Sequence, residues 1–380
     1  MSDLAVIGAG VVGLSAAWLL AEADVAVTVL DSGAAGSGVS RRAHGEIVPP
    51  APAVQPLWRE SLLMYERLAG HGEFEWDATP VGTAVVADHG AEELLLARAD
   101  AAPDAHRVDG AGLAAVEPAI ASSSAGAVLL AEGRRLHPQR AVAILARCAR
   151  NAGATVRGGV TVVALQHLGA GGWRLQTSDG DVIDVPRVVV AAGLRTPQLV
   201  EDTGVSIPLV GVRGRILLTE PLPPLLTRII SDVGAGAAAL AAARTTMKDL
   251  AADRDPSVAV AVLVHQRRDG RLAIGSSWAA SLRPEELCTA GQMAKAAVRR
   301  IPRLADVVVE DSWSGVRPCS VDGRPVIGEV AQGLYVCCGH GGEGFMNGPG
   351  SAALLSRIVL GRPRAPWAHL FRATRFTQAS

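Results

Sequence analysis

Three glycines near the N-terminus have the type and spacing of residues that bind a dinucleotide. The run Gly8, Ala9, Gly10, Val11, Val12, Gly13 is a GxGxxG, and an acid, Asp31, follows it. Gly8 permits a tight turn, Gly10 lets the backbone approach a pyrophosphate, and Gly13 lets a helix pack closely on a strand. The carboxylate of Asp31 would accept hydrogen bonds from a ribose hydroxyl.

The elements around this motif have the order that positions it. Leu4–Ile7 is a short apolar strand, Leu14–Glu22 is rich in alanine and leucine and predicts a helix, and Val25–Leu30 is a second strand. The free amides and the dipole of the helix N-terminus bind phosphates. A glycine turn with no ligand would also fit the motif alone, but the complete unit favours a dinucleotide site.

The segment that follows Asp31 favours FAD over NAD. Residues 37–47 read Ser-Gly-Val-Ser-Arg-Arg-Ala-His-Gly-Glu-Ile. A nicotinamide enzyme would usually continue with helix–strand alternation, whereas a flavin enzyme needs an extended loop of small residues beneath its long cofactor. A nicotinamide dehydrogenase stays an alternative. Purified protein without flavin absorbance would favour that alternative.

A second glycine cluster lies near the C-terminus. Residues 339–344 read Gly-His-Gly-Gly-Glu-Gly, and residues 315–328 contain the run Arg-Pro-Cys-Ser-Val-Asp-Gly. Backbone amides of Gly341–Gly344 could stabilise a negative charge, helped by a helix expected to start near Gly350. A plain turn is the alternative, but so many glycines indicate close approach of the backbone to a ligand.

Together these segments resemble the glycine oxidase / D-amino-acid oxidase family of flavoproteins. Further matching segments are 136–140, 188–193, 207–209, 213–215 and 269–275. The 339–344 run looks closer to opine oxidase, hydroxyproline dehydrogenase and hydrogen cyanide synthase subunits, which can work in larger assemblies. A homo- or hetero-oligomer is therefore one expectation.

The resemblance implies an α/β fold: a Rossmann-like FAD-binding domain interleaved with an α+β substrate domain on a mostly antiparallel sheet. The expected FAD-binding pieces are 1–47, 130–205 and 315–365, and the expected substrate-domain pieces are 48–129 and 206–314. Residues 366–380 are expected to form a tail outside the core. The alanine-rich segment 235–252 is expected to be a helix, serving as a lid, a partner surface or a plain insertion.

The resemblance also implies which residues contact FAD. They are Gly8, Ala9, Gly10, Val11, Val12, Gly13, Asp31, Ser32, Ser40, Arg41, Arg42, Ala43, His44, Gly45, Glu46, Val162, Ala191, Ala192, Gly193, Arg317, Gly341, Gly342, Glu343, Gly344, Phe345 and Met346. Some relatives attach FAD to a cysteine, but Cys319 lies where non-covalent members have an ordinary residue. Non-covalent FAD is expected.

Arg317 and three histidines are the candidates for substrate chemistry. Arg317 matches the family's carboxylate-binding arginine, and a planar guanidinium suits a planar carboxylate; a structural salt bridge is the alternative. His44 and His265 are catalytic candidates to accept the amine proton or to set polarity, and His340 is more suited to orienting the glycine turn. A lone histidine is more often structural.

The resemblance implies oxidation of the C–N bond of a small amino acid or amine. Hydride would pass to flavin N5 and give an imine, with O2 as acceptor. One alternative is a dehydrogenase that passes electrons to a quinone or partner subunit, and another is a non-catalytic flavin-binding subunit. Substrate, stereochemistry and acceptor stay open.

The composition excludes several other classes. The 380 residues carry a formal net charge of −1, which gives no reason to expect a nucleic-acid or anionic-membrane partner. Five irregularly spaced cysteines without a CxxC pair predict reduced thiols in a cytoplasmic protein and no metal site. The apolar run from Leu4 to Ala21 follows an acid and is interrupted by glycines, so neither a signal peptide nor a membrane span is expected.

Overall fold

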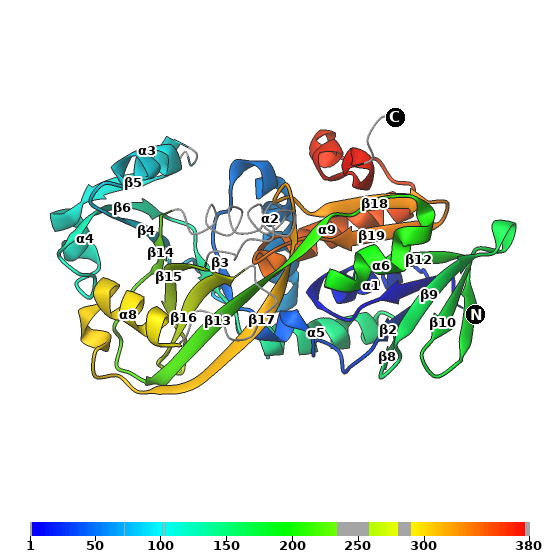
Figure 1. The fold of residues 1–380 in the computed structure, drawn as a ribbon, viewed down its shortest axis with the longest axis horizontal. Coiled ribbons are helices and arrows are strands. Elements are labelled where there is room, and N and C mark those ends of the chain that lie inside the picture. The colour runs from blue at the N-terminus through cyan, green and yellow to red at the C-terminus, as the bar shows by residue number, and fades with distance from the viewer. Residues whose placement is uncertain are drawn as a thin grey trace.

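The computed structural model describes residues 2–71, 73–100, 102, 104–233, 258–279 and 290–376. The strands form two large sheets at opposite ends of an elongated molecule, and the long strands β13 and β17 run between them (Figure 1). The alanine-rich segment 235–252 lies outside the described residues.

The first large sheet has six strands in the order β18-β19-β12-β1-β2-β8. All neighbours are parallel except β18 and β19. The central strand β1 is buried along its whole length, as expected for an apolar run covered on both faces. The bounds are β1 Leu4–Ile7, β2 Val27–Asp31, β8 Thr155–Gly158, β12 Arg187–Val190, β18 Val326–Ala331 and β19 Leu334–Cys338.

Helices cover this sheet and share one hydrophobic core with it. They are α1 Val11–Ala21, α2 Gln55–Ala69, α5 Pro138–Asn151 and α9 Gly344–Val359. Helix α2 belongs to a segment expected in the substrate domain, yet Leu57 and Tyr65 pack into the core around β1, and the Tyr65 hydroxyl donates to the Phe345 carbonyl at 2.7 Å. The domain boundaries stay a prediction.

A smaller antiparallel sheet, β11-β10-β9, packs against the other side of the six-stranded sheet. Its strands are β9 Val162–His167, β10 Trp173–Thr177 and β11 Val182–Val185, and the short helix α6 Thr196–Val200 lies beside it. Leu175 and Val188 meet in the core between the two sheets.

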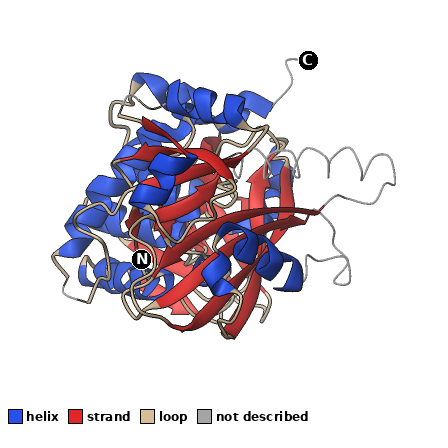
Figure 2. Cartoon of the chain, turned by 90° about the vertical axis from the view of Figure 1, so that its left-hand side faces the viewer, coloured by secondary structure: helices blue, strands red, loops and turns tan. Residues whose placement is uncertain are grey.

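The second large sheet has eight strands in the order β17-β13-β16-β15-β14-β4-β6-β5, and it is antiparallel except between β14 and β4. This confirms the mostly antiparallel sheet. The strands are β4 Thr83–Asp88, β5 His106–Asp109, β6 Ser124–Leu130, β13 Leu209–Pro221, β14 Ile229–Asp232, β15 Val258–Gln266, β16 Arg271–Ala279 and β17 Val309–Ser320. Helices α3 Glu92–Asp100, α4 Gly110–Val116 and α8 Ala290–Arg300 pack on it. Figure 2 shows many of the helices on the left and at the top, with strands running through the middle to the lower right edge.

Two expectations about the C-terminal region are wrong. Helix α9 begins at Gly344 and not near Gly350, so the glycine cluster leads directly into its first turn. The segment after Trp367 is not outside the core: Phe371 is fully buried, and Arg375 forms an ion pair with Asp322 at 2.8 Å. The helix prediction failed because Pro349, which usually breaks a helix, lies inside α9.

Candidate active site

The N-terminal glycines are required by close contacts between main chains. Gly8 has φ +109°, and a Cβ there would lie 2.4 Å from the Ala191 carbonyl oxygen. A Cβ at Gly13 would lie 1.9 Å from the Gly8 oxygen. The Ala191 amide also donates to the Ile7 carbonyl at 2.8 Å, so the ends of β1 and β12 meet at this turn.

The N-terminus of α1 is suited to bind an anion. Gly10 is its N-cap and has no side chain to satisfy the first amides. Ser40 Oγ accepts from the Val11 amide at 3.1 Å. A bare helix N-terminus of this kind holds phosphate oxygens, so these residues fit the pyrophosphate of FAD.

Asp31 lies at the end of β2, beside the glycine turn. Its two oxygens accept from the Ala9 amide at 2.7 Å and from the Gly33 amide at 2.8 Å. Each carboxylate oxygen has a second acceptor position, so a ribose contact remains compatible. Val162, the other expected nucleotide contact, is buried at the start of β9, and its carbonyl accepts from Arg195 at 3.1 Å.

The segment after the turn connects the nucleotide loop to the antiparallel sheet. A short 3-10 helix, η1 Val39–Arg42, interrupts the expected extended loop. Arg42 donates to the Ser314 carbonyl at 2.8 Å, and Trp313 donates to the Arg42 carbonyl at 3.0 Å. Ser32 and Arg41 are exposed. The chain then forms β3 Glu46–Ile47, which pairs with β7 Arg134–Arg135.

The C-terminal glycine turn lies directly beside Arg317. The Gly341 amide donates to the Pro318 carbonyl at 2.9 Å, and a Cβ at Gly342 would lie 3.3 Å from Arg317 Nε. His340 holds the turn through Ser351, at 2.9 Å, and burial lowers its pKa to about 4. His340 is thus neutral and structural at pH 7, which agrees with the orienting role expected for it.

Arg317 is a desolvated cation held by neutral acceptors. Its guanidinium donates to the Ser277 carbonyl at 2.9 Å and to the Ser276 hydroxyl, and it lies 5.5 Å from the centre of the Trp278 ring. Burial lowers its pKa. None of the ion pairs found among the described residues includes Arg317. A half-buried cation without a carboxylate partner is unusual, and a bound anion would supply the missing charge.

Gly214 makes room for that guanidinium. A Cβ at Gly214 would lie 2.0 Å and 2.2 Å from the two terminal nitrogens of Arg317. The 213–215 segment was expected to match the family, but no role was predicted for Gly214, and Ser276, Ser277 and Trp278 were not predicted to lie in the site. These contacts depend on the register of β13, β16 and β17, which the local sequence does not specify.

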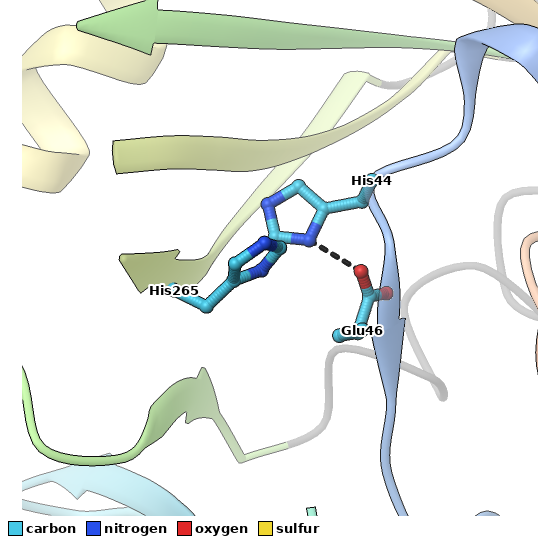
Figure 3. Close-up of side chains that lie close together, drawn as sticks. All are labelled: His44, Glu46 and His265. Atoms are coloured by element: carbon cyan, nitrogen blue, oxygen red, sulfur yellow. Dashed lines mark hydrogen bonds and ion pairs between the residues drawn. The ribbon is translucent and has the colours of Figure 1, made fainter. Parts of the chain in front are cut away.

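His44, Glu46 and His265 come together in the interior (Figure 3). The His44 Nδ1 atom contacts a Glu46 carboxylate oxygen, and its Nε2 lies 2.9 Å from the Ala273 carbonyl oxygen. The His44 and His265 rings meet edge to face, with centres 4.6 Å apart. Burial, with the nearby charge of His44, lowers the pKa of His265 well below its ordinary value.

Strand β16 connects this cluster to Arg317. A Cβ at Gly275 would lie 3.2 Å from His44 Cδ2, while the next two residues bind the guanidinium. The structure therefore brings the three proposed catalytic residues, Arg317, His44 and His265, to one strand of the antiparallel sheet. Arg317 alone of the three lies against the glycine turn.

Glu343 adds a titratable group to the glycine turn. Its carboxylate accepts from Asn347 Nδ2 at 2.7 Å. Burial raises its pKa to about 7, and the negative charge of Glu46 acts in the same direction. The turn therefore carries a carboxyl group whose pKa lies near neutral pH. When this group is ionised, its negative charge opposes the binding of another anion at the turn.

A family model described as FAD dependent oxidoreductase, DAO, matches residues 3–358. A D-amino acid dehydrogenase of Methylobacterium nodulans is 29% identical, covering 94% of this chain and 95% of its own. Hydrogen cyanide synthase subunit HcnC of Pseudomonas aeruginosa is 27% identical, covering 82% of this chain and 72% of its own. The crystal structure of glycine oxidase from Geobacillus kaustophilus superposes with a TM-score of 0.82 at 23% identity, covering 98% of both chains.

Proposed function

The chain belongs to the FAD dependent oxidoreductase family, DAO, and from this premise we propose that it oxidises the C–N bond of a small amino acid whose carboxylate is bound by Arg317. The chain is an oxidoreductase and FAD is its cofactor, as its relatives and family indicate. The amino acid itself, the stereochemistry at its carbon and the electron acceptor belong to the proposal.

The observation that carries the proposal is the unpaired charge of Arg317. Its hydrogen-bond partners are a serine carbonyl and a serine hydroxyl, both neutral. A planar carboxylate would complete this site with two parallel hydrogen bonds. An amino acid anchored in this way has its amine-bearing carbon fixed beside the glycine turn, because that turn is bonded to Pro318.

The main chain at the glycine turn supports the cofactor. FAD, when bound, supplies the two-electron acceptor for hydride from the carbon that bears nitrogen. The amides of Gly341 and Glu343 already donate to the Pro318 and His340 carbonyls, so the N-terminus of α9 is the part of the turn that places partial positive charge beside Arg317. This arrangement favours an anion there without any additional cationic side chain.

The nucleotide half would be held by the residues around α1 and β2. We propose that the amides following Gly10 bind the pyrophosphate and that Asp31 binds the ribose, with Val162 beside the adenine. Ser40 would leave its bond with Val11 or share it with a phosphate oxygen. We propose non-covalent attachment, since burial raises the pKa of Cys319 to about 11 and the thiol is a poor nucleophile.

The histidine cluster would set the protonation of the amine. His265 is neutral at pH 7 and keeps an unbonded Nδ1. His44 already bonds at both ring nitrogens. We propose that this pair sets the polarity around the substrate, so that the substrate amine loses its ammonium proton to solvent before oxidation. An uncharged amine is required for hydride loss.

A dehydrogenase reaction is the second candidate. The D-amino acid dehydrogenase and the cyanide synthase subunit are named for activities that differ from a glycine oxidase. The name of the second, which calls it a subunit, favours a partner subunit as the electron acceptor.

Among the described residues, no helix has both the length and the apolar character needed to span a membrane. Four described cysteines are free thiols, which supports placement in the cytoplasm.

Anaerobic flavin reduction tests the proposal. Purified holoenzyme would be mixed with glycine, sarcosine, D- and L-amino acids, proline derivatives and opines, and the loss of flavin absorbance followed. Bleaching by at least one carboxylate-bearing amine is expected. Bleaching by none would favour a non-catalytic flavin-binding subunit. Hydrogen peroxide in aerated buffer would identify O2 as acceptor, and its absence, with activity on a quinone dye, would identify a dehydrogenase.

A further inference from the structure

Three potential metal ligands converge between β3 and the eight-stranded sheet. One ligand atom each from His44, Glu46 and His265 lies within 4.8 Å of the other two. Figure 3 shows that the two imidazoles and the carboxylate are directed towards one another. His44 is 8% exposed and His265 is 1% exposed, so the group is inside the protein.

A backbone carbonyl fixes the orientation of the His44 ring, as is common for histidines that bind a metal. A carbonyl oxygen can only accept, so His44 Nε2 must donate its proton to Ala273 at 2.9 Å. Its Nδ1 is then the atom directed at Glu46 and His265. Ligating histidines commonly donate their other N–H to a carbonyl in this manner, which sets the tautomer.

His265 supplies an independent observation. Its Nδ1 is buried and has no hydrogen-bond partner. A buried polar nitrogen without a partner carries a desolvation penalty of about 1–3 kcal/mol. None of the hydrogen bonds among the described residues satisfies it, and this free nitrogen belongs to the same three-residue cluster.

A cavity borders the cluster on the side of His265. This residue lines a cavity of about 140 Å³. Glu75, Asp77 and Asp269 also line the cavity, together with several arginines. The cavity is large enough for a water molecule beside His265.

We propose that His44, Glu46 and His265 form a binding site for a divalent d-block metal ion, with Zn²⁺ the best-suited ion. Two imidazoles and one carboxylate are a known three-ligand set for zinc with an open fourth position. Two nitrogen ligands of three exclude Ca²⁺ and Mg²⁺, which require oxygen. On binding, the Glu46 carboxylate would exchange its contact with His44 Nδ1 for a contact with the metal.

The test of this inference is separate from the test of the proposed oxidation, although both assign a role to His44 and His265. The ligands lie on β3, on the residues preceding it and on β15, and the test measures bound metal, not turnover. Absence of zinc binding would therefore overturn the site and leave the amino-acid oxidation untouched. Absence of flavin bleaching would do the reverse.

Zinc titration of the holoenzyme tests the site. Chelator-treated, dialysed protein would be titrated with ZnCl2 by calorimetry, and retained zinc measured by mass spectrometry. One tightly bound Zn²⁺ per chain is expected. His265→Gln and Glu46→Gln should each weaken binding at least about tenfold. His71→Gln removes a histidine outside the cluster and should leave binding unchanged.

Two further measurements guard against misfolding and against a surface site. Circular dichroism and flavin content would show that each variant is folded. X-ray absorption at the zinc edge should give nitrogen and oxygen neighbours at about 2.0–2.2 Å and no sulfur. Three results would each overturn the assignment: wild-type protein that retains no zinc, zinc affinity in Glu46→Gln and His265→Gln equal to that of wild type, or a sulfur neighbour of the bound zinc.

Discussion

The nucleotide loop and the arginine site are built by opposite means. Around Gly8 and Gly13, main-chain atoms touch one another and glycine is required because any Cβ would overlap them. Around Arg317, a charged side chain of β17 is held by the Ser277 carbonyl and the Ser276 hydroxyl of β16, and Gly214 leaves room for its guanidinium. Binding by main chain is sensitive to added atoms, whereas binding by a side-chain charge is sensitive to lost atoms.

The two regions also differ in how far apart their residues lie in the sequence. Most of the nucleotide loop lies within about one βαβ unit. The arginine site combines residues near positions 214, 276, 317 and 342, which meet only because three strands pair in one register. Substitutions in the first region should affect cofactor retention, and those in the second should affect substrate affinity with cofactor retained.

The largest effect is expected for Gly13→Val. Its Cβ would overlap the Gly8 carbonyl oxygen, which is main chain and cannot move aside. We expect a loss of stability of about 3 kcal/mol or more and protein purified without FAD. Gly38→Ala is the matched control, because a Cβ there meets no atom within 4 Å. A yellow, normally stable Gly13→Val protein would contradict the close-packed turn.

Gly214→Ala should separate the second region from the first. The added methyl group overlaps the flexible end of Arg317, so the guanidinium moves and the fold survives. We expect KM for the amino acid to rise about ten- to a hundredfold, which corresponds to about 1.4–2.7 kcal/mol, with FAD content unchanged. Gly70→Ala, at the end of α2, serves as control. Purification of Gly214→Ala with reduced FAD content, and an unchanged KM in the fraction that keeps FAD, would contradict the assignment of this region to substrate binding.

Asp31→Ala should weaken FAD binding moderately. The substitution leaves the Ala9 and Gly33 amides without their acceptor and removes the proposed ribose contact. Each lost hydrogen bond of this kind is worth about 1–3 kcal/mol, so we expect a rise in the FAD dissociation constant of tenfold or more. Fluorescence titration of the apoprotein measures it. Unaltered affinity would remove Asp31 from the nucleotide site.

Glu343→Gln should give the smallest effect, one that depends on pH. The folded-state pKa of Glu343, about 7, is above its ordinary value of 4.5, so ionisation is disfavoured in the folded protein. Its stabilising contribution is complete below pH 4.5 and is lost as pH rises through 7. The glutamine variant should therefore melt higher than wild type at pH 8, by less than about 4 °C, and equally at pH 4.5. A constant difference across this range would contradict the assignment.

The nucleotide half of the fold could be predicted because its signals are local. The strand Leu4–Ile7 has the predicted bounds, and Asp31 ends β2 as expected. Gly8 and Gly13 have the predicted structural roles, since both occupy close approaches. These properties follow from hydrophobic runs and glycine spacing, which a continuous segment contains in full.

The arginine site could be predicted only in part. Arg317 was identified by resemblance, but its contacts with Ser276 and Trp278 depend on strand pairing between distant segments. The start of α9 was misplaced because Pro349 argues against a helix that tertiary packing nonetheless maintains. Buried Phe371 was assigned to a tail because a short apolar segment after the last helix carries no signal of where it docks.

The most direct test of the account compares an amino acid substrate with the amine that lacks its carboxylate, in wild type and in Arg317→Ala. Flavin reduction would be followed anaerobically by stopped flow, with Arg317→Lys as a charge-retaining control. We predict that the Arg317→Ala substitution weakens binding of the amino acid by about 2–5 kcal/mol. Binding of the amine that lacks the carboxylate, and the FAD content, should not change. An equal loss with both compounds, or no loss with either, would contradict carboxylate binding by Arg317.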